Sequence, residues 1–396
     1  MRVFITGTGM VSAIGNDVTD TFQSLWQGTS GIRLVENEGL SSHPIMAGIV
    51  PLENDELLSE LRIPGDGNIP RTALLAIKAA REALKNDHLT GRDLGFFNGT
   101  TTGGMDLTEQ FFKSYITQSD LSGFLKTRLH DLGKMSFFVA NSVCTPIYED
   151  TLSTACSSAA NSILLGMKYI RSGRIDRALV GGSDALLALT VSGFKSLMIY
   201  DEERCKPFST NRNGLNLGEG AAYLLLENES SIKKSNNTIL AELTGGWNAN
   251  DHYHATASSP DGRGALKAMK GALKDSNTDP SDLDYINAHG TGTVNNDQSE
   301  LNALQRLLSG IEIPFSSTKG FTGHTLGAAG ALEAVVSVIS IQEGFMPANL
   351  SDESLLDNGF MHPIGETKKD VLVNTVMSNS FGFGGNCTSL IFKKHA

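Results

Sequence analysis

The sequence predicts an α/β protein built from two similar halves. Of its 396 residues, 40% are hydrophobic and 42 are glycine, a composition that suits a compact α/β domain with many tight turns. The chain also repeats a pattern. In each half a segment of small residues leads into an apolar helical stretch, and glycines followed by an apolar strand close the half. The length allows two or three domains.

The repeat predicts two pairs of corresponding elements. They are helices at 159–167 and 328–336, and closing strands at 221–226 and 386–392. Separate strands are expected at 3–6 and at 283–286. The polar stretch 228–237 separates the two sets and is the expected linker. We therefore predict halves at residues 1–235 and 236–396.

Composition excludes several classes of protein. The formal net charge of −11 argues against a nucleic-acid binder. No run of about twenty apolar residues occurs, and Arg2 leads straight into the first strand without a signal-peptide core, so neither a membrane protein nor an exported one is expected. The cysteines are widely spaced: Cys144, Cys156, Cys205 and Cys387. Neither a disulfide framework nor a zinc ribbon is indicated, and a reducing cytoplasm fits.

Two local motifs hint weakly at cofactors. Gly7 and Gly9 follow the first expected strand, as in a dinucleotide-binding turn, but Ser12 stands where the motif needs a third glycine. His252 and His254 could bind a metal, but they lack acidic or cysteine partners at ligand spacing. We predict no cofactor and no metal.

Cys156 lies in the segment Ser-Thr-Ala-Cys-Ser-Ser-Ala-Ala at 153–160, directly before the first expected helix. The unpaired N–H groups and positive dipole end of that helix favour a thiolate, so this thiol is expected to be nucleophilic near neutral pH. A small buried cysteine is the alternative, since free cysteines are among the most buried residues. The rest of the chain favours the nucleophile.

Two histidines supply that context. His289 lies in the glycine-rich turn 287–293, after an expected strand, and His324 closes the segment 317–324, before the second expected helix. Either one alone could be a hydrogen-bonded core residue. Two loop histidines beside glycines, together with Cys156, point instead to a catalytic site.

Four motifs carry a family resemblance. They are the cysteine segment 153–160, His289-Gly-Thr-Gly-Thr, Lys319 with Gly323-His324, and Asn-Ser-Phe-Gly-Phe-Gly-Gly at 379–385. In this order they resemble the β-ketoacyl-acyl-carrier-protein synthases, the elongating condensing enzymes of fatty-acid and polyketide synthesis. The resemblance covers essentially the whole chain, and four ordered motifs make it specific.

The resemblance implies a thiolase-like fold, in which two α/β halves form a five-layered α-β-α-β-α sandwich with strands buried on both faces. It implies that Cys156 holds an acyl chain as a thioester while His289 and His324, as neutral imidazoles, bind the malonyl thioester and stabilise the enolate left by decarboxylation. The backbone N–H groups of Cys156 and Phe383 would form the oxyanion hole, and Phe383 would be a gate.

Further residues take roles by the same resemblance. Lys319 and Glu333 would form an ion pair that organises the site, and Asp297 and Glu300 would be structural. The implied acyl pocket is lined by Thr102, Phe194 and Phe381. Relatives with long-chain substrates often carry Gly-Ile-Gly-Gly near the pocket floor, whereas this chain has Thr101-Thr102-Gly103-Gly104, so acyl length and saturation stay open.

The implied partner is an acyl carrier protein, and the chain is expected to form a homodimer or a heterodimer with a related subunit. The basic residues expected to dock the carrier protein are Lys126, Arg128, Lys134, Arg204 and Lys206. Initiating synthases replace one histidine by asparagine, and thiolases use a second cysteine, so both fit less well. A non-catalytic chain-length factor typically lacks the cysteine. The chain could still be the catalytic half of a heterodimer with such a factor.

Overall fold

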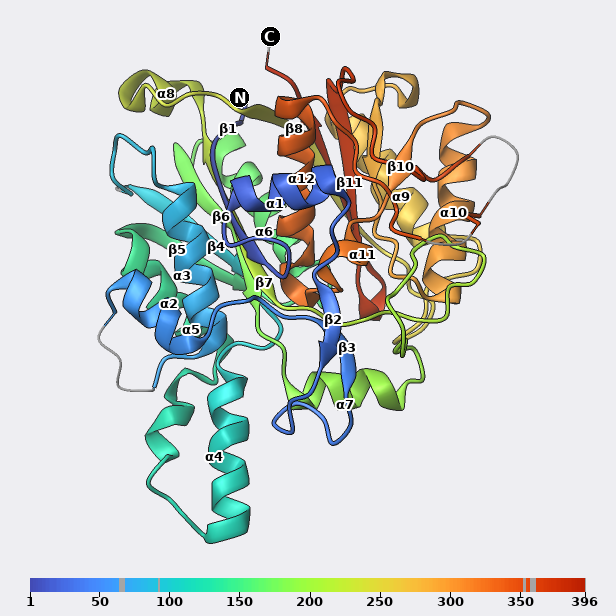
Figure 1. Cartoon of the computed structure of the whole chain (residues 1–396). Helices are drawn as coiled ribbons and strands as arrows, with labels where there is room; N and C mark the ends of the chain where they lie inside the picture. The colour runs from blue at the N-terminus through green and yellow to red at the C-terminus, as the bar shows by residue number, and fades with distance from the viewer. Residues whose placement is uncertain (64–67, 92, 352–353, 357–360, 396) are drawn as a thin grey trace.

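The computed structural model describes residues 1–63, 68–91, 93–351, 354–356 and 361–395 (Figure 1). Its central feature is a ten-stranded sheet to which both halves contribute. The strands of the first half are β1 (Phe4–Ser12), β4 (Leu94–Gly99), β5 (Pro146–Leu152), β6 (Arg177–Asp184) and β7 (Gly220–Glu227). Those of the second half are β8 (Ala241–Asn250), β9 (Tyr285–Asn287), β10 (Phe315–Ser316), β11 (Thr375–Phe381) and β12 (Asn386–Lys393).

The strand order shows the duplication directly. From edge to edge it is β5-β4-β6-β7-β1-β8-β12-β11-β9-β10, and the two halves meet where β1 pairs with β8. In the first half β5, β4 and β6 are parallel, while β7 and β1 alternate in direction. The second half repeats this arrangement with β10, β9, β11, β12 and β8. The predicted duplication is therefore confirmed, whereas the boundary between residues 235 and 236 stays a prediction.

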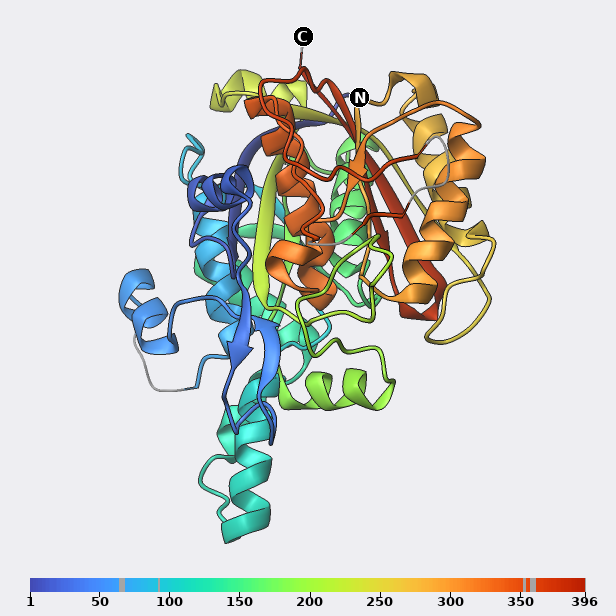
Figure 2. The same cartoon turned by 45° about the vertical axis from the view of Figure 1, so that its right-hand side comes forward.

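The strands of each half form one layer of the sandwich, called a half-sheet below. The helices form the other three layers, as Figures 1 and 2 show. One outer layer covers the first half-sheet, the middle layer lies between the half-sheets, and the other outer layer covers the second. In that order the helices are α3 (Arg71–Ala83) and α5 (Leu132–Val143), α6 (Ser158–Arg171) and α12 (Ala329–Glu343), and α9 (Arg263–Asp275) and α10 (Val294–Leu308). β6 and β7 are buried along their whole length, as strands covered on both faces must be.

The repeated small residues have a packing reason. A Cβ on Gly330 of α12 would lie 2.8 Å from the Cβ of Ala160 of α6, so the two middle helices meet through residues that lack bulk. The stretch Leu326–Glu343 is apolar and long enough to cross a membrane, but 89% of it is buried inside the fold. Its hydrophobicity is that of a core helix.

The glycine pair near the N-terminus lies in a strand. The strand expected at 3–6 extends to Ser12, so Gly7 and Gly9 are inside β1. A Cβ on Gly7 or Gly9 would lie 2.0 Å from a carbonyl oxygen of α3, at Ala83 or Ala79. These glycines therefore let α3 approach the sheet, and the expected turn after residue 6 is corrected to continuous strand.

The chain has further elements outside the five layers. Between β4 and β5, the helix α4 (Met105–Gln118) and the 3₁₀ turn η1 (Phe124–Leu129) extend away from the body of the molecule (Figure 1). The polar stretch expected as a linker contains the short helix α8 (Glu229–Ser235). The remaining elements are α1 (Val18–Gln27), β2 (Ile32–Val35), β3 (Ile45–Gly48), α2 (Asn54–Leu61), α7 (Ala188–Ser196), η2 (Pro280–Asp282), α11 (Lys319–Thr322), η3 (Leu326–Ala328) and η4 (Phe383–Gly385).

Candidate active site

The three predicted catalytic side chains meet in one cavity where the two halves join. Cys156, His289 and His324 all line a cavity of about 320 Å³. Cys156 precedes α6, His289 follows β9, and His324 precedes η3 and α12, so both halves contribute. Phe194, Phe381 and Phe383 also line it. A polar wall completes the cavity with Asn213, Ser258, Thr291, Thr293, Asn295 and Asn296.

Cys156 sits on a strained turn. Ala155 has φ +53°, in the left-handed region that residues with a side chain seldom adopt, and α6 begins three residues later at Ser158. The thiol is 6% exposed. Burial raises its pKa to about 11, although the backbone N–H groups of Phe383 and Cys156 and the Lys319 cation act in the opposite direction.

This pKa corrects the expectation of a thiolate near neutral pH. A helix N-terminus favours the anion, but here burial outweighs that effect, so the thiol keeps its proton at neutral pH.

The segment expected to act as a gate lies against the thiol. A Cβ on Gly382 would lie 3.0 Å from the backbone nitrogen of Cys156, so a side chain here would crowd the Cys156 backbone and glycine is favoured. Gly384 has φ +77°. The Phe383 ring stacks on Phe194 of α7, with ring centroids 5.6 Å apart. The Phe383 N–H is directed at the Cys156 sulfur, as the lowering effect on the thiol pKa indicates.

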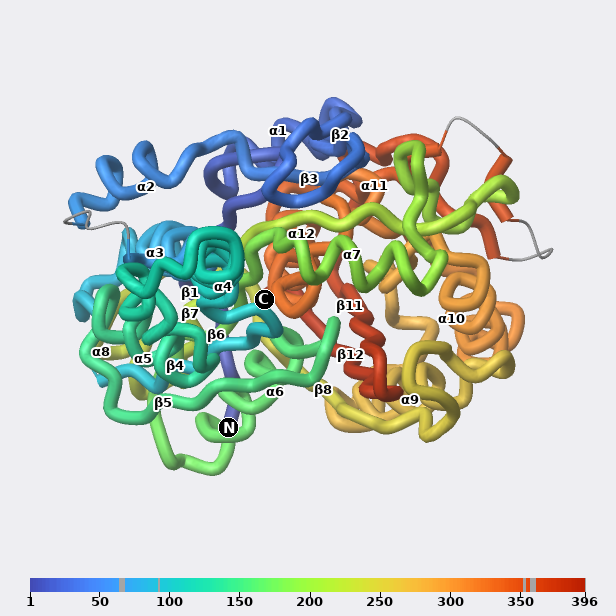
Figure 3. Tube along the Cα trace, turned by 90° about the horizontal axis from the view of Figure 1, so that it is seen from below, coloured from blue at the N-terminus to red at the C-terminus, as the bar shows by residue number. Residues whose placement is uncertain are grey.

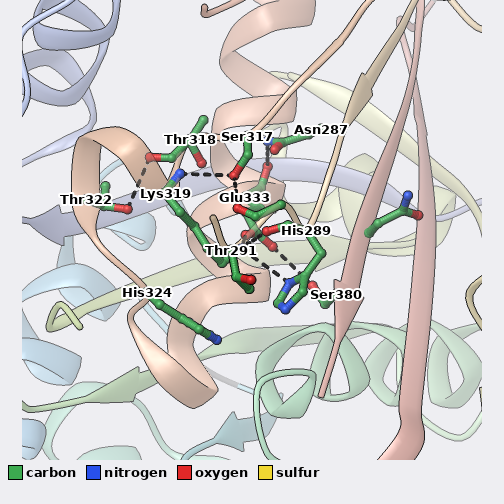
Figure 4. A network of polar contacts seen from close by, with 12 residues as sticks. Asn287, His289, Thr291, Ser317, Thr318, Lys319, Thr322, His324, Glu333 and Ser380 are labelled. Carbon is green, nitrogen blue, oxygen red and sulfur yellow. Dashed lines mark hydrogen bonds and ion pairs between the residues drawn. The ribbon is translucent and has the colours of Figure 1, made fainter. Parts of the chain in front are cut away.

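His289 is held by Lys319 (Figure 4). The Lys319 ammonium donates to the His289 carbonyl oxygen at 2.6 Å and lies 3.3 Å from its Nδ1. An ammonium has no acceptor, so Nδ1 must accept and the proton of a neutral ring resides on Nε2. Burial lowers the pKa of His289 well below its usual 6.5, and the charge of Lys319 lowers it further. His289 is therefore a neutral N–H donor.

His324 reaches the same state by another route. The backbone N–H of Leu326 donates to its Nδ1 at 3.2 Å, which again leaves the proton on Nε2. Burial and the Lys319 charge lower its pKa well below 6.5. The two imidazole rings lie edge to face, with centroids 5.5 Å apart. The site thus presents two neutral imidazole donors close together.

Lys319 and Glu333 form a buried ion pair, each side chain 2% exposed. Glu333 projects from α12 and also accepts from the Ser380 hydroxyl at 3.2 Å. Burial raises the pKa of Glu333, and the adjacent ammonium opposes that effect. The pair places the Lys319 ammonium between His289 and Glu333 of α12.

Two further carboxylates hold the His289 loop. Glu300 accepts from the backbone N–H groups of His289 and Gly290 at 3.0 and 2.9 Å, and burial raises its pKa to about 7. Asp297 accepts from the N–H groups of Thr291 and Gly292 at 2.9 and 3.2 Å. Both residues belong to α10 and face the loop backbone, which is a structural arrangement.

Asp184 is a residue that the motif search missed. It ends β6, is fully buried, and its carboxylate accepts from six donors. Five are the hydroxyl or backbone N–H groups of Thr100, Thr101 and Thr102, and the sixth is the N–H of Gly327. Asp184 therefore ties the loop after β4 to the turn that follows His324. Three consecutive threonines and an acid at a strand end were the available signals.

The acyl-pocket role of Thr102 stays a prediction. Its side chain is 1% exposed, its hydroxyl donates to Asp184 at 2.8 Å, and it is not among the residues that line the Cys156 cavity. A hydroxyl beside a buried carboxylate is drawn toward that acceptor, so it does not face the cavity. Phe194 and Phe381 do line the cavity.

The five basic residues expected to dock a carrier protein lie on two segments. Lys126 and Arg128 are in η1 and Lys134 is in α5, whereas Arg204 and Lys206 lie in the loop after α7. The Lys206 ammonium is 2.9 Å from the Glu203 carboxylate. None of the five lines the Cys156 cavity.

Comparisons with known proteins agree with this geometry. Models of the β-ketoacyl synthase N-terminal and C-terminal domains match residues 1–231 and 240–353. The chain is 34% identical over 427 residues to the putative mitochondrial 3-oxoacyl-[acyl-carrier-protein] synthase of Schizosaccharomyces pombe, covering 99% of both chains. It is 32% identical over 413 residues to 3-oxoacyl-[acyl-carrier-protein] synthase 2 of Staphylococcus aureus, covering 100% of this chain and 98% of that one.

Solved structures give the same result. The ishigamide ketosynthase/chain length factor matches with a TM-score of 0.91 and 29% identity, over 100% of this chain and 99% of that one. A ketosynthase in complex with its chain length factor from Xenorhabdus doucetiae matches with a TM-score of 0.85 and 31% identity, over 100% and 98%. With matches along its whole length and a site built from both halves, the chain belongs to the β-ketoacyl synthase family of acyltransferases.

Proposed function

We propose that this protein is a 3-oxoacyl-[acyl-carrier-protein] synthase that uses Cys156 as its nucleophile and His289 and His324 as its enolate-stabilising donors. The observation that carries these roles is that one cavity joins a thiol to two neutral imidazoles whose Nδ1 atoms are both occupied. Family membership and the names of the relatives support the activity.

In the first step the Cys156 sulfur attacks the acyl thioester of a carrier protein. A C–S bond to Cys156 forms, the C–S bond to the carrier's thiol breaks, and the Cys156 proton leaves with that thiol. Because burial raises the pKa of Cys156, loss of this proton must accompany attack. The backbone N–H groups of Phe383 and Cys156, both of which act to lower the pKa of the thiol, would bind the oxyanion.

In the second step malonyl thioester replaces the first carrier. Its C–C bond to the carboxylate breaks, carbon dioxide leaves, and the electron pair forms an enolate whose oxygen accepts from the Nε2–H groups of His289 and His324. The enolate carbon attacks the Cys156 thioester, a new C–C bond forms, and the C–S bond to Cys156 breaks. The released thiolate takes up a proton from solvent, which restores the thiol. The product is a β-ketoacyl chain two carbons longer than the acyl chain that entered.

A Cys156→Ala variant tests this assignment. Intact-mass analysis after incubation with acyl carrier protein should show an acyl adduct on the parent protein and none on the variant, and condensation should fall by at least roughly 10⁴-fold. Cys144→Ala, which changes a thiol outside the cavity, is the matched control and should keep the adduct. An adduct on the Cys156→Ala variant would assign the nucleophile elsewhere.

A second candidate is the catalytic half of a heterodimer. Two of the matching structures are described as ketosynthases with a chain length factor, and this chain keeps the cysteine that such factors typically lack. We propose this as the assembly in which the condensing activity operates. A cytoplasmic location is part of the same proposal and is supported by the absence of any disulfide among the four cysteines.

A further inference from the structure

The outer face of α9 carries a line of basic side chains. Arg263, Lys267, Lys270 and Lys274 are spaced by four, three and four residues. Because each residue of an α-helix advances by about 100°, the four side chains lie within an arc of about 60°. All four are exposed, and the buried residues of α9 lie on the opposite side. We call this surface the basic face of α9; it is about 16 Å long, or about three turns of helix.

No carboxylate neutralises the basic face of α9. Its three lysines form no ion pair in the part of the chain that the structure describes. The two acids that flank the helix are already paired elsewhere. Asp261, which precedes α9, lies 3.5 Å from Arg306, and Asp275, its last residue, lies 2.8 Å from Arg171. In a chain of net charge −11 this helix therefore keeps an uncompensated positive surface.

The neighbouring helix adds no negative charge from the side. α10 lies beside α9 in the outer layer of the second half (Figure 3). The two carboxylates of α10, Asp297 and Glu300, are buried and accept from the backbone of the His289 loop. The remaining residues of α10 that reach the surface are neutral or basic: Val294, Asn295, Asn296, Gln298, Asn302, Gln305 and Arg306.

Exposed aromatic side chains flank the basic face of α9. Trp247 of β8 is 47% exposed and lies against the helix at Gly271, since a Cβ on that glycine would lie 2.2 Å from the Trp247 ring. Tyr253 is 52% exposed, and the Arg263 guanidinium lies 6.0 Å from the centre of its ring. Tryptophan, tyrosine and arginine are enriched where proteins bind other proteins. The combination indicates a protein partner that carries negative charge and some apolar surface.

Arg263 joins the basic face of α9 to the wall of the active-site cavity. Its guanidinium donates to the carbonyl oxygens of Asp251 and His252 at 3.3 and 3.2 Å, and Asp251 lines the cavity that contains Cys156. Val294, the first residue of α10, also lines this cavity and is 60% exposed, so it forms part of the rim. A protein bound to the basic face would therefore lie beside the rim of the Cys156 cavity.

We propose that the basic face of α9 binds an acidic helix of the acyl carrier protein while the arm that carries the acyl thioester enters the Cys156 cavity. This inference rests on the proposed function, which supplies the partner. A carrier protein fits better than another acidic protein, because it must place a reactive arm at this rim. Met198 lines the same cavity in the first half, and the loop that follows it carries Lys206. The carrier protein is therefore held from both halves of the chain.

The test compares two substrates for acylation of Cys156: hexanoyl-acyl carrier protein, and hexanoyl-N-acetylcysteamine, which lacks the carrier. Lys267→Gln/Lys270→Gln/Lys274→Gln should raise KM for the carrier substrate by at least roughly tenfold at low salt and leave kcat unchanged, because surface charges act on encounter. At about 1 M salt the difference should fall below about twofold, since the Debye length is then only about 3 Å. KM for the small substrate should stay the same.

Two controls separate position from net charge. Lys85→Gln/Lys233→Gln/Lys368→Gln removes the same charge from exposed positions outside α9 and should leave both KM values unchanged. Lys270→Glu/Lys274→Glu should impair the enzyme further with the carrier substrate. A carrier protein in which two acidic helix residues are replaced by lysine should recover at least about tenfold of that loss.

Three results would each overturn the proposal. They are equal KM values for the α9 variant and its control, an equal loss with the small substrate, and no recovery with the charge-reversed carrier protein. Binding of the parent protein, but not the α9 variant, to phosphatidylglycerol vesicles with an unchanged KM for the carrier substrate would assign this face to a lipid surface instead. Acylation of Cys156 by the small substrate tests the proposed function separately, because that reaction needs no docked protein.

Discussion

The two halves share a strand order but carry different chemistry at equivalent positions. Cys156 precedes α6, the first helix of the middle layer, and His324 precedes α12, the second. After β4 the loop holds three threonines, whereas after the equivalent β9 the loop holds His289. The duplicated scaffold therefore brings equivalent loops to one junction. In the proposed mechanism, the first half supplies the nucleophile and the second half binds the enolate.

The two halves also differ in how a buried carboxylate is stabilised beside the loops of the site. In the first half the buried Asp184 carboxylate is satisfied by uncharged hydroxyl and N–H donors. In the second half the buried Glu333 carboxylate is paired with the Lys319 ammonium. Burial lowers the pKa of both histidines, and the Lys319 ammonium lowers it further. The cation therefore lies in the half whose imidazoles stay neutral.

The sharpest test of this division removes the imidazoles. His324→Ala should lower malonyl decarboxylation by roughly 10²- to 10⁴-fold, because a donor to the enolate is lost, while acylation of Cys156 persists. His289→Ala should behave in the same way. Carbon dioxide release and intact mass measure the two half-reactions separately. His254→Ala, outside the cavity, is the control. Equal losses in both half-reactions would show that the halves do not divide the chemistry.

The second prediction concerns stability. Lys319→Ala leaves the buried Glu333 carboxylate without its cation and should lower the free energy of unfolding by roughly 3–5 kcal/mol. The double variant Lys319→Met/Glu333→Gln removes both charges and should be clearly more stable than Lys319→Ala. Urea unfolding of the two proteins measures the difference. A double variant no more stable than the single one would mean that an uncompensated charge is not the cause.

The corresponding change in the first half should have a smaller effect. Asp184→Asn replaces one carboxylate oxygen by an amide NH₂ group that faces two other donors, the Thr101 hydroxyl and the Gly327 N–H. The free energy of unfolding should fall by about 1–3 kcal/mol. Because Gly327 follows the turn of His324, decarboxylation should fall by roughly tenfold or more beyond any loss in acylation. Thr102→Val removes one donor only and should be milder. An Asp184→Asn protein with unchanged decarboxylation would separate this carboxylate from His324.

Alkylation of the enzyme without substrate shows whether burial or the helix N-terminus has the larger effect on the pKa of the Cys156 thiol. Because the pKa of the thiol is raised to about 11, the thiolate fraction at neutral pH is small and grows as pH rises. The rate of iodoacetamide labelling should therefore increase about tenfold per pH unit from about pH 7 to about pH 9.5. Peptide mapping identifies the labelled cysteine. A plateau near neutral pH would restore the helix-terminus expectation.

The smallest effect is expected at the surface. Lys134→Glu or Lys206→Glu should raise KM for carrier-bound substrates by roughly two- to tenfold and weaken the dependence of KM on salt, because rim charges steer encounter. Small thioester mimics serve as the control and should be affected little. Since the two lysines lie on different segments, the larger of the two effects locates the docking surface. A loss of the same size with mimics would place the defect in the active site instead.

The sequence by itself was enough for the fold class, the duplication and the grouping of Cys156, His289 and His324. These follow from short motifs whose order matches a family and from a repeated helix-and-strand pattern, both of which are local properties of the chain. The ion pair between Lys319 and Glu333 followed from the same resemblance, and the structure places the two side chains in contact.

Only the tertiary structure decided the properties that depend on burial and on distant neighbours. The pKa of Cys156 rises because water is excluded by both halves, which a helix-terminus argument does not include. The Thr102 hydroxyl turns toward Asp184, 82 positions away. Gly7 and Gly9 lie inside a strand, where the lack of a side chain lets α3 pack closely on the sheet. Likewise β5 is an open edge only because of its place in the strand order. Each of these depends on which segments come together in space, and a linear pattern does not contain that information.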